Sequence, residues 1–196
     1  RCVVNWDTDG DKELSKAEAA KVTSLGGVFT ECDDIVAFDE LKYFTGLTEI
    51  EPEAFYGAYN LNKITLPKSI KSIGEYAFAD CVGLIQLNIN DGVKKIGYGA
   101  FEECRNLKSI TIPGSVEEIQ LTYEHYYDDG ELDVEYGNPF TNCTSLEAIY
   151  SPYASDNRSI IMDNTLIYVA SAGINEYTIP AKVKSIANNA LGSSDY

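Results

Sequence analysis

The sequence predicts a solenoid, in which the chain winds into stacked coils of similar length. Apolar residues recur every 23 positions, and three successive units begin at Leu61, Leu84 and Leu107. Three further series keep the same interval, namely Ile64, Leu87 and Ile110, then Ile73, Ile96 and Ile119, and finally Phe55, Phe78 and Phe101. An alanine precedes each of these phenylalanines. A fixed period of this length is typical of repeat proteins. Because each unit buries its apolar face only against its neighbours, such a protein exposes one continuous surface, which favours binding over catalysis.

About five units fill residues 38–196. Two of them, 61–83 and 84–106, are intact; a third begins at Leu107 and is interrupted, and the last ends in the segment 177–191. The first unit is degenerate, and two interpretations of its start remain open. It begins either with a strand or with a helix that follows a strand displaced toward the N-terminus, over 35–38.

The sequence of one unit shows how a coil forms. The segment 64–66 alternates like a short strand. Pro67 then ends the strand, because proline has no N–H to donate to a neighbouring strand. Ile70 and Ile73 turn the chain back into the core, and the pair Ala77–Phe78 suits stacking against the next unit.

The repeating pattern LxxIxIPxxVxxIGxxAFxxCxxL resembles the BspA-like leucine-rich repeats of bacterial surface proteins. The resemblance implies a right-handed leucine-rich repeat solenoid with a parallel concave β-sheet and short helical or irregular convex segments. It also implies an extracellular or outer cell-surface location, including attachment as a lipoprotein. Adhesion is the implied role, with a host or extracellular protein or glycan as partner. The alternative is a structural scaffold or spacer module attached to other domains, which calcium could stabilise. On the concave strands, Thr65, Asn88 and Thr111 are expected to form a polar row that could face a ligand.

An insertion interrupts the third unit. Ile73 and Phe78 are five residues apart, whereas Ile119 and Phe140 are 21 apart, so 16 residues are added. The insertion, near 121–137, carries six acidic residues and no lysine or arginine. It also carries five aromatic candidates for a binding surface, which are Tyr123, His125, Tyr126, Tyr127 and Tyr136.

Two runs of alternating residues flank Asp129–Gly130, which is a strong signal for a hairpin turn. We therefore expect a projecting β-hairpin. Its tyrosines either contact a partner or lie on the neighbouring repeats. A second insertion, near 150–173, predicts another hairpin with its turn near Asp163–Asn164, and its apolar strands favour packing over recognition.

Residues 1–37 form a separate N-terminal segment that resembles EF-hand and dockerin-type calcium loops. Counted from the first aspartate, the calcium-ligand positions of such a loop are occupied by Asp7, Asp9, Asp11, Glu13, Ser15 and Glu18. Lys12 stands where these loops have glycine, which adds backbone strain and a positive charge. The alternative is a capping helix that begins with the capping box of Ser15 and Glu18 and ends near Leu25.

Composition excludes several classes of partner. The formal net charge of −16, from 31 acidic and 15 basic side chains, argues against nucleic acid and against anionic membranes. No apolar stretch approaches the roughly 20 residues of a membrane span. The single histidine lies in the acidic insertion, and the chain has no common catalytic motif, so we do not expect an enzyme.

The chain has five cysteines. Cys81, Cys104 and Cys143 share one repeat position, which predicts a column of small buried thiols. Cys2 and Cys32 lie outside the predicted units and could pair with each other.

Overall fold

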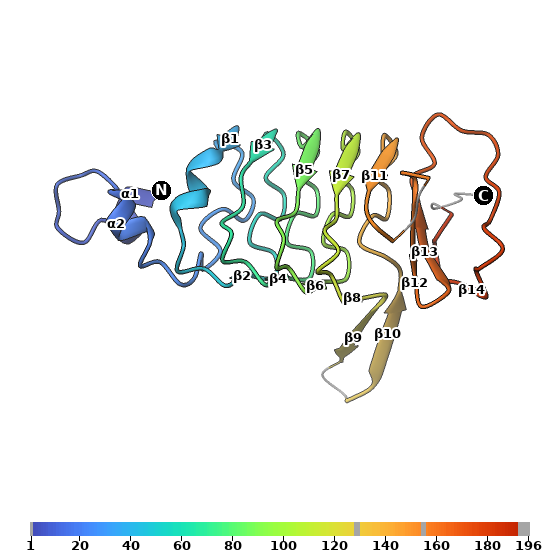
Figure 1. Ribbon diagram of the computed structural model, residues 1–196. Coiled ribbons are helices and arrows are strands. Elements are labelled where there is room, and N and C mark those ends of the chain that lie inside the picture. Colours follow the sequence, from blue (N-terminus) through green and yellow to red (C-terminus); the bar gives the residue numbers. More distant parts are fainter. Residues whose placement is uncertain (1, 128–129, 154–155, 192–196) are drawn as a thin grey trace.

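Short parallel strands from successive coils pair in register along the molecule (Figure 1). The computed structural model describes residues 2–127, 130–153 and 156–191. We call the strands along one side the first ladder, which consists of β1 (Ala37–Phe38) with β3 (Lys63–Ile64), and of β5 (Gln86–Asn88), β7 (Ser109–Thr111) and β11 (Ala148–Tyr150). Leu87 lies opposite Ile110. The 23-residue period is therefore the register of the parallel sheet, and the predicted solenoid is confirmed.

A second parallel ladder lies on the opposite side of the coils (Figure 1), where the sequence indicated only helical or irregular segments. Its strands are β2 (Glu49–Ile50), β4 (Ser72–Ile73), β6 (Lys95–Ile96) and β8 (Glu118–Ile119). In each strand the isoleucine is buried and the preceding residue is not. Because two residues are too few to show alternation, the sequence pattern revealed the buried isoleucines but not their strands.

The core contains one column of stacked phenylalanine rings, as predicted. Adjacent ring centroids in Phe55, Phe78, Phe101 and Phe140 lie 5.2, 5.8 and 5.6 Å apart, with interplanar angles of 2°, 8° and 12°. All four side chains are fully buried. Aromatic pairs at this spacing stabilise a fold beyond the burial of their area, so the column connects each coil to the next.

The column starts before the first predicted unit. The ring of Phe29 stacks on Phe55 at 5.4 Å and 16°. Cys32 follows three residues later, as cysteines do in the later units, and Glu31 adopts a positive φ of 50°, like the 58° of Asp80 at the matching position. The sequence signal, F-x-x-C, was easy to miss because Phe29 precedes Phe55 by 26 residues rather than 23.

The predicted thiol column is also confirmed. Cys81, Cys104 and Cys143 are buried free thiols. Each Sγ donates a hydrogen bond of 3.1 Å to a phenylalanine carbonyl oxygen of the preceding unit. Burial raises the pKa of Cys81 to about 12 and that of Cys104 well above its usual range, so these thiols stay protonated and inert. Cys2 and Cys32 are free thiols as well.

We expect Cys104→Ala to lower the free energy of unfolding by about 1–2 kcal/mol, because it leaves a small cavity and removes one S–H hydrogen bond. Urea denaturation followed by circular dichroism measures this change. Cys2→Ala, at a half-buried position, is the control with a smaller expected loss. A loss above about 3 kcal/mol for Cys104→Ala would show that the column needs sulfur itself rather than a small side chain.

Two short helices lie at the N-terminal end of the solenoid (Figure 1). The first, α1 (Cys2–Trp6), is too short to be stable alone. The ring of Trp6 packs edge-on against Phe44, with centroids 5.4 Å apart, and so couples the helix to the first coil.

The second helix, α2 (Lys16–Ala19), begins at the predicted capping box. The predicted extension to Leu25 is wrong. Beyond the helix the chain follows the first coil, where the backbone N–H of Leu25 donates to Glu51 Oε2 at 2.8 Å. After β1 comes a 3₁₀ helix (Asp39–Tyr43), so the first unit starts with the displaced strand and a helix.

The second insertion forms the predicted hairpin. Its strands β12 (Ser159–Met162) and β13 (Thr165–Val169) pair antiparallel. Asp163 and Asn164 have φ of 49° and 63°, which is typical of two-residue hairpin turns. Ile160 and Leu166 are fully buried, and β13 also pairs in parallel with β14 (Ser185–Ile186). This hairpin therefore belongs to the packed solenoid and does not project.

Candidate functional site

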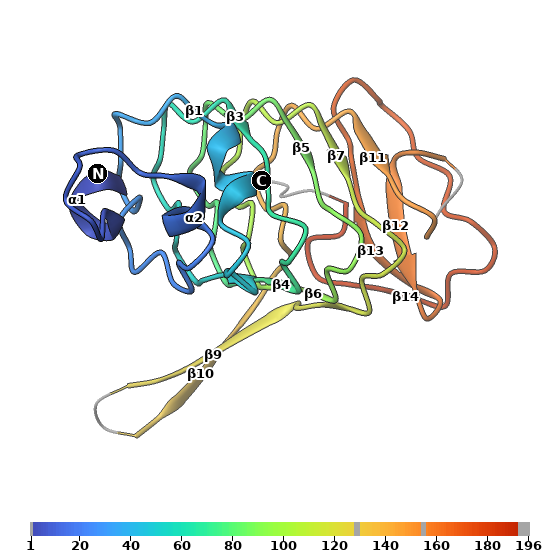
Figure 2. The ribbon, with the colours of Figure 1, turned by 60° about the vertical axis from the view of Figure 1, so that its left-hand side comes forward.

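The first insertion projects from the solenoid as a two-stranded antiparallel hairpin (Figure 2). Its strands are β9 (Thr122–Tyr126) and β10 (Leu132–Tyr136). The backbone N–H of Gly137 donates to the carbonyl oxygen of Leu121 at 3.0 Å, so the two ends of the insertion lie side by side. The hairpin is confirmed, and its predicted turn at Asp129–Gly130 lies partly outside the described residues.

One side of the hairpin, which we call the inner face, contacts the solenoid. Residues directly opposite each other in a sheet share a face, and the inner face carries the pairs Tyr123/Glu135 and His125/Asp133. The ring of Tyr123 lies 5.7 Å from that of Tyr76 and 5.8 Å from that of Tyr98. The hydroxyl of Tyr76 donates to Glu135 Oε2 at 3.4 Å. The base of the hairpin is therefore held against two earlier repeats.

The polar groups of the inner face also bond to one another. His125 Nε2 lies 3.7 Å from Asp133 Oδ2, and the hydroxyl of Tyr127 donates to the same oxygen at 3.1 Å. The rings of His125 and Tyr127 meet edge-on at 5.0 Å. These contacts give the histidine a structural role within the hairpin.

The opposite side, the outer face, carries Thr122, Glu124, Tyr126, Leu132, Val134 and Tyr136. Three of its large side chains are exposed: Tyr126 by 71%, Leu132 by 49% and Tyr136 by 59%. The interpretation that the tyrosines lie on the repeats holds for Tyr123, whereas Tyr126 and Tyr136 are exposed. Sequence reasoning missed Leu132 and Val134, which the alternation of the second strand could have identified.

The base of the hairpin is strongly acidic. Glu102 is half-buried there, and its pKa is raised to about 6 by burial and by the nearby charges of Glu103, Glu135 and Asp80. Burial is the main cause of this shift, and the neighbouring carboxylates add to it.

The raised pKa of Glu102 predicts a stability that falls with pH. The folded state binds the extra proton between pH 4.5 and about 6, so the free energy of unfolding decreases as pH rises through that window. Glu102→Gln is expected to increase the free energy of unfolding by about 1 kcal/mol at pH 7, after allowance for solvent screening. At pH 4 we expect no measurable change, because the carboxyl is then protonated in both the folded and the unfolded state. Denaturation at both pH values tests this, with the exposed Glu147→Gln as control. A gain at pH 4 equal to that at pH 7 would contradict it.

The predicted polar row lies on the first ladder. The hydroxyl of Thr111 donates to Asn88 Oδ1 at 3.0 Å, and that of Thr65 donates to Asp39 Oδ1 at 2.7 Å. These side chains therefore bond first to one another and to Asp39, which leaves fewer polar groups for a ligand.

A cleft of about 560 Å³ interrupts the same face between β3 and β5, which belong to separate sheets. Amide side chains and one exposed isoleucine line it, including Asn62, Gln86, Asn88 and Ile85. The break leaves an open polar channel across the first ladder.

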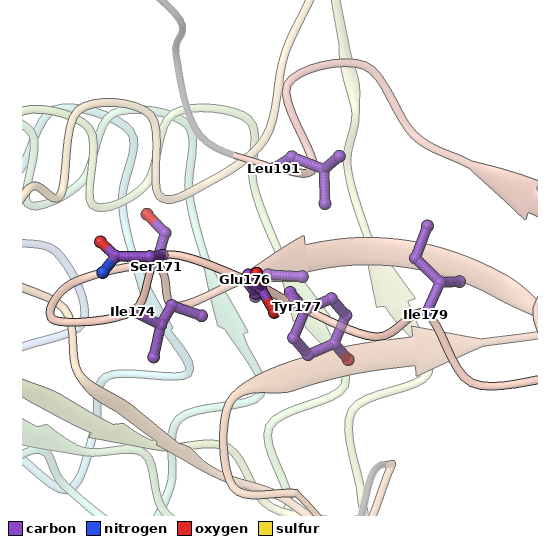
Figure 3. Close-up of a pocket in the computed structure, with 8 residues that line it drawn as sticks. Ser171, Ile174, Glu176, Tyr177, Ile179 and Leu191 are labelled. Atoms are coloured by element: carbon purple, nitrogen blue, oxygen red, sulfur yellow. The ribbon is translucent and has the colours of Figure 1, made fainter.

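A smaller pocket of about 280 Å³ lies at the C-terminal end of the described chain (Figure 3). Its lining combines apolar side chains, including Ile174, Ile179 and Leu191, with polar side chains such as Ser171 and Asn175. Glu176 and Tyr177 are the ionisable side chains among its described lining residues. This arrangement offers no pair of carboxylates for acid–base chemistry.

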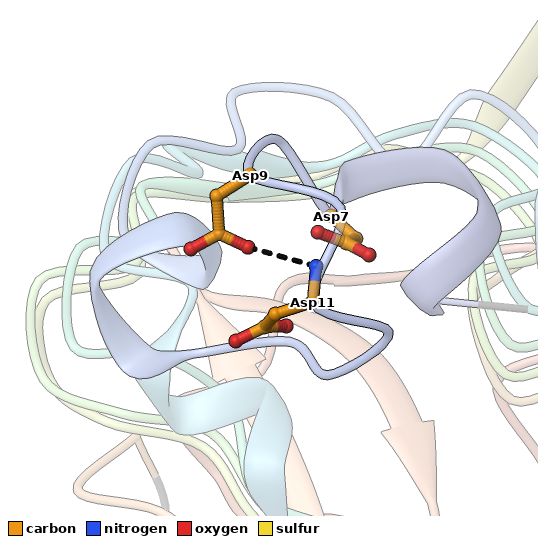
Figure 4. Close-up of side chains that lie close together, drawn as sticks. All are labelled: Asp7, Asp9 and Asp11. Atoms are coloured by element: carbon orange, nitrogen blue, oxygen red, sulfur yellow. Dashed lines mark hydrogen bonds between the residues drawn. The ribbon is translucent and has the colours of Figure 1, made fainter.

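The N-terminal loop brings together three of the predicted calcium ligands (Figure 4). Carboxylate oxygens of Asp7, Asp9 and Asp11 all lie within 4.8 Å of one another. Asp7 accepts hydrogen bonds from the backbone N–H groups of Gly10 at 2.7 Å and Lys12 at 2.9 Å. Lys12 adopts φ of 70°, the left-handed conformation that explains why glycine is usual at this loop position.

Two further predicted ligands, Ser15 and Glu18, bond to each other at the start of α2. Glu18 is buried and accepts hydrogen bonds from the backbone and hydroxyl of both Thr8 and Ser15, at 2.6–3.0 Å. These bonds lower the pKa of Glu18 to about 2. Glu13 is exposed and contributes its backbone N–H to Asp11 Oδ1 at 2.8 Å. The donor set is all oxygen, which suits calcium.

Within the described residues, no helix has both the length and the apolar character to cross a membrane. Comparison with protein families matches residues 26–124 to six copies of the BspA type leucine rich repeat region. No curated protein is significantly similar.

Solved structures of leucine-rich repeat proteins are similar over part of this chain. A leucine-rich repeat protein from Bacteroides ovatus is 30% identical over 40% of this chain and 22% of its own, with a TM-score of 0.37. The pneumococcal vaccine antigen PcpA is 18% identical over 74% and 40%, with a TM-score of 0.45. A leucine rich cell surface protein from Faecalibacterium prausnitzii is 21% identical over 71% and 48%, with a TM-score of 0.34. The chain thus spans less than half the length of each.

Proposed function

Because the chain belongs to the BspA-type leucine-rich repeat family, we propose that it is a non-enzymatic binding module of a bacterial cell-surface or secreted protein. The partner is an extracellular protein or glycan. The observation that carries this proposal is the outer face of the hairpin, where Tyr126, Leu132 and Tyr136 lie exposed on an element that projects from the solenoid.

The hairpin has the properties of a contact surface. Tyrosine gives a large contact area at a low cost in conformational entropy. Packing of Tyr123 on Tyr76 and Tyr98 fixes the base of an element that would be only marginally stable alone. An exposed aromatic face on a fixed support favours recognition over a purely decorative role.

The test compares the native chain with a deletion of residues 121–136. Removal of these 16 residues restores the five-residue spacing between Ile119 and Phe140, so the coil can close as it does in the intact units. Both proteins are immobilised and probed with extracellular-matrix proteins and polysaccharides, and circular dichroism verifies folding. We expect a partner that binds the native chain and not the folded deletion variant. A partner bound equally by both would place the site elsewhere on the solenoid.

The second candidate is a scaffold module that stacks against other domains. It is favoured by the last coil, where Ile179, Ile186 and Leu191 are exposed by 40%, 48% and 54% although residues at matching positions of inner coils are buried. This candidate predicts self-association measured by light scattering and lost in Ile186→Asn. A monomer at all concentrations, together with hairpin-dependent binding, would favour the binding module.

We also propose that the loop of Asp7, Asp9 and Asp11 binds calcium and stabilises the N-terminal end. At calcium concentrations 100-fold above the dissociation constant, the free energy of unfolding rises by about 2.7 kcal/mol, so the melting temperature should increase and chelator should reverse the change. Lys12→Gly should tighten binding, since it removes strain and a positive charge. Asp91→Asn, in the solenoid, is the control. Titration calorimetry that shows no heat at millimolar calcium would leave the capping helix as the whole role of this segment.

A further inference from the structure

The contacts described above between the hairpin and the repeats come from its inner face, so they do not explain the composition of the outer face. Its apolar groups form a continuous strip across both strands, because Tyr126 lies opposite Leu132 and Tyr136 lies opposite Thr122. Glu124, opposite Val134, is exposed within the strip. Large apolar side chains held in water on a projecting element mark an interaction site more often than a structural one.

The charge of the hairpin narrows the chemistry of the partner. The insertion carries six carboxylates and no lysine or arginine. At its base, Glu135 of the hairpin lies near Glu102, whose pKa is raised mainly by burial and further by the charges of Glu103, Glu135 and Asp80. An anionic partner is therefore repelled. A second copy of the chain is disfavoured for the same reason, since two such hairpins would bring twelve carboxylates together.

The class of partner that remains carries positive charge and can also make apolar contacts. Lysine and arginine side chains carry long methylene stems and a charged head, and their heads interact favourably with the faces of tyrosine rings. Exposed tyrosine and leucine side chains around the exposed Glu124 offer both kinds of contact.

Resting on the binding function proposed above, we propose that the outer face of the hairpin binds an extended segment of a partner protein that is rich in lysine and arginine. The tyrosines contact the methylene stems, and Glu124 pairs with a charged head.

The experiment uses a fluorescent decapeptide of alternating arginine and valine, with alternating glutamine–valine and glutamate–valine peptides as matched probes. Fluorescence anisotropy measures their binding to the full chain. We expect the arginine peptide alone to bind, with affinity that falls as salt is raised. Tyr126→Ser and Tyr136→Ser should each weaken it by about tenfold or more, and Glu124→Gln should weaken it by a smaller factor. Tyr150→Ser, at a tyrosine of the first ladder that is 48% exposed, should leave binding unchanged.

Four outcomes would overturn the inference. Equal binding of the arginine peptide to the folded deletion of residues 121–136 would mean that the net charge of the chain attracts it without the hairpin. Equal binding of the glutamine peptide would show that the positive charge of the partner does not contribute to recognition. A protein or glycan captured through the hairpin while the arginine peptide fails to bind would leave the proposed function intact and reject a cationic partner. Absence of both kinds of binding would reject the two together.

Discussion

Replacement of Phe101 by alanine is expected to lower the free energy of unfolding by about 3–5 kcal/mol. The ring is fully buried and stacks between Phe78 at 5.8 Å and Phe140 at 5.6 Å. Its loss leaves a cavity in the middle of the column. Because coils of a solenoid contact only their neighbours, the two halves of the protein then lose part of their coupling. Urea denaturation followed by circular dichroism measures the change.

Phe101→Leu is the matched control, since it keeps most of the apolar volume and should cost about 1–1.5 kcal/mol. We also expect the alanine variant to unfold over a broader range of urea concentration, because a weakened interface separates the coils before and after it. A loss below about 1 kcal/mol for Phe101→Ala would mean that the neighbouring side chains collapse into the cavity and that the column is not the main connection between coils.

Gly97→Ala is expected to cost about 3 kcal/mol or more, at the upper end of overpacking effects. A Cβ added at Gly97 would lie 2.6 Å from the backbone nitrogen of Glu75 and 2.6 Å from the carbonyl carbon of Gly74. These atoms belong to the backbone of the preceding coil, so no side-chain rotation relieves the contact. The same variant should shift the coil that contains Gly97 away from the preceding coil, and should thus weaken the contacts of the hairpin that follows.

Gly114→Ala serves as the control for this prediction. Its added Cβ would meet Pro152 Cγ at 3.1 Å, an atom of a side chain in a turn, so a loss of about 0.5–1 kcal/mol is expected. Equal losses for the two variants would indicate that the preceding coil adjusts easily to the added methyl group and that Gly97 does not set the spacing of the coils. Thermal and urea denaturation of both proteins decide between these explanations.

Several features of the molecule were accessible from the sequence because they repeat. The phenylalanine and cysteine columns follow from the 23-residue interval, since each core residue lies on its equivalent in the next coil. The hairpins followed from breaks in that interval and from turn residues such as Asp163–Asn164. The start of the solenoid at Phe29 was missed, because three additional residues shift it out of register.

Other features depended on contacts between units and could not be predicted. The helix after Ser15 ends early because the chain that follows bonds to Glu51 in the first coil, a partner far away in sequence. The break between β3 and β5 has no counterpart in the regular pattern of the repeats. The hydrogen bonds from Thr8 and Ser15 to Glu18 depend on how the N-terminal loop folds back on itself.

The sequence by itself determined the solenoid, its register and its buried columns. The reason is that apolar residues at a fixed interval are all buried together when equivalent residues of successive coils stack on one another. It also determined the position, aromatic content and negative charge of the projecting insertion. Only the tertiary structure decided which hairpin face lies on the repeats and which faces solvent. The physical reason is that an alternating strand has two equivalent faces, and the contact of Tyr123 with Tyr76 and Tyr98 selects one of them.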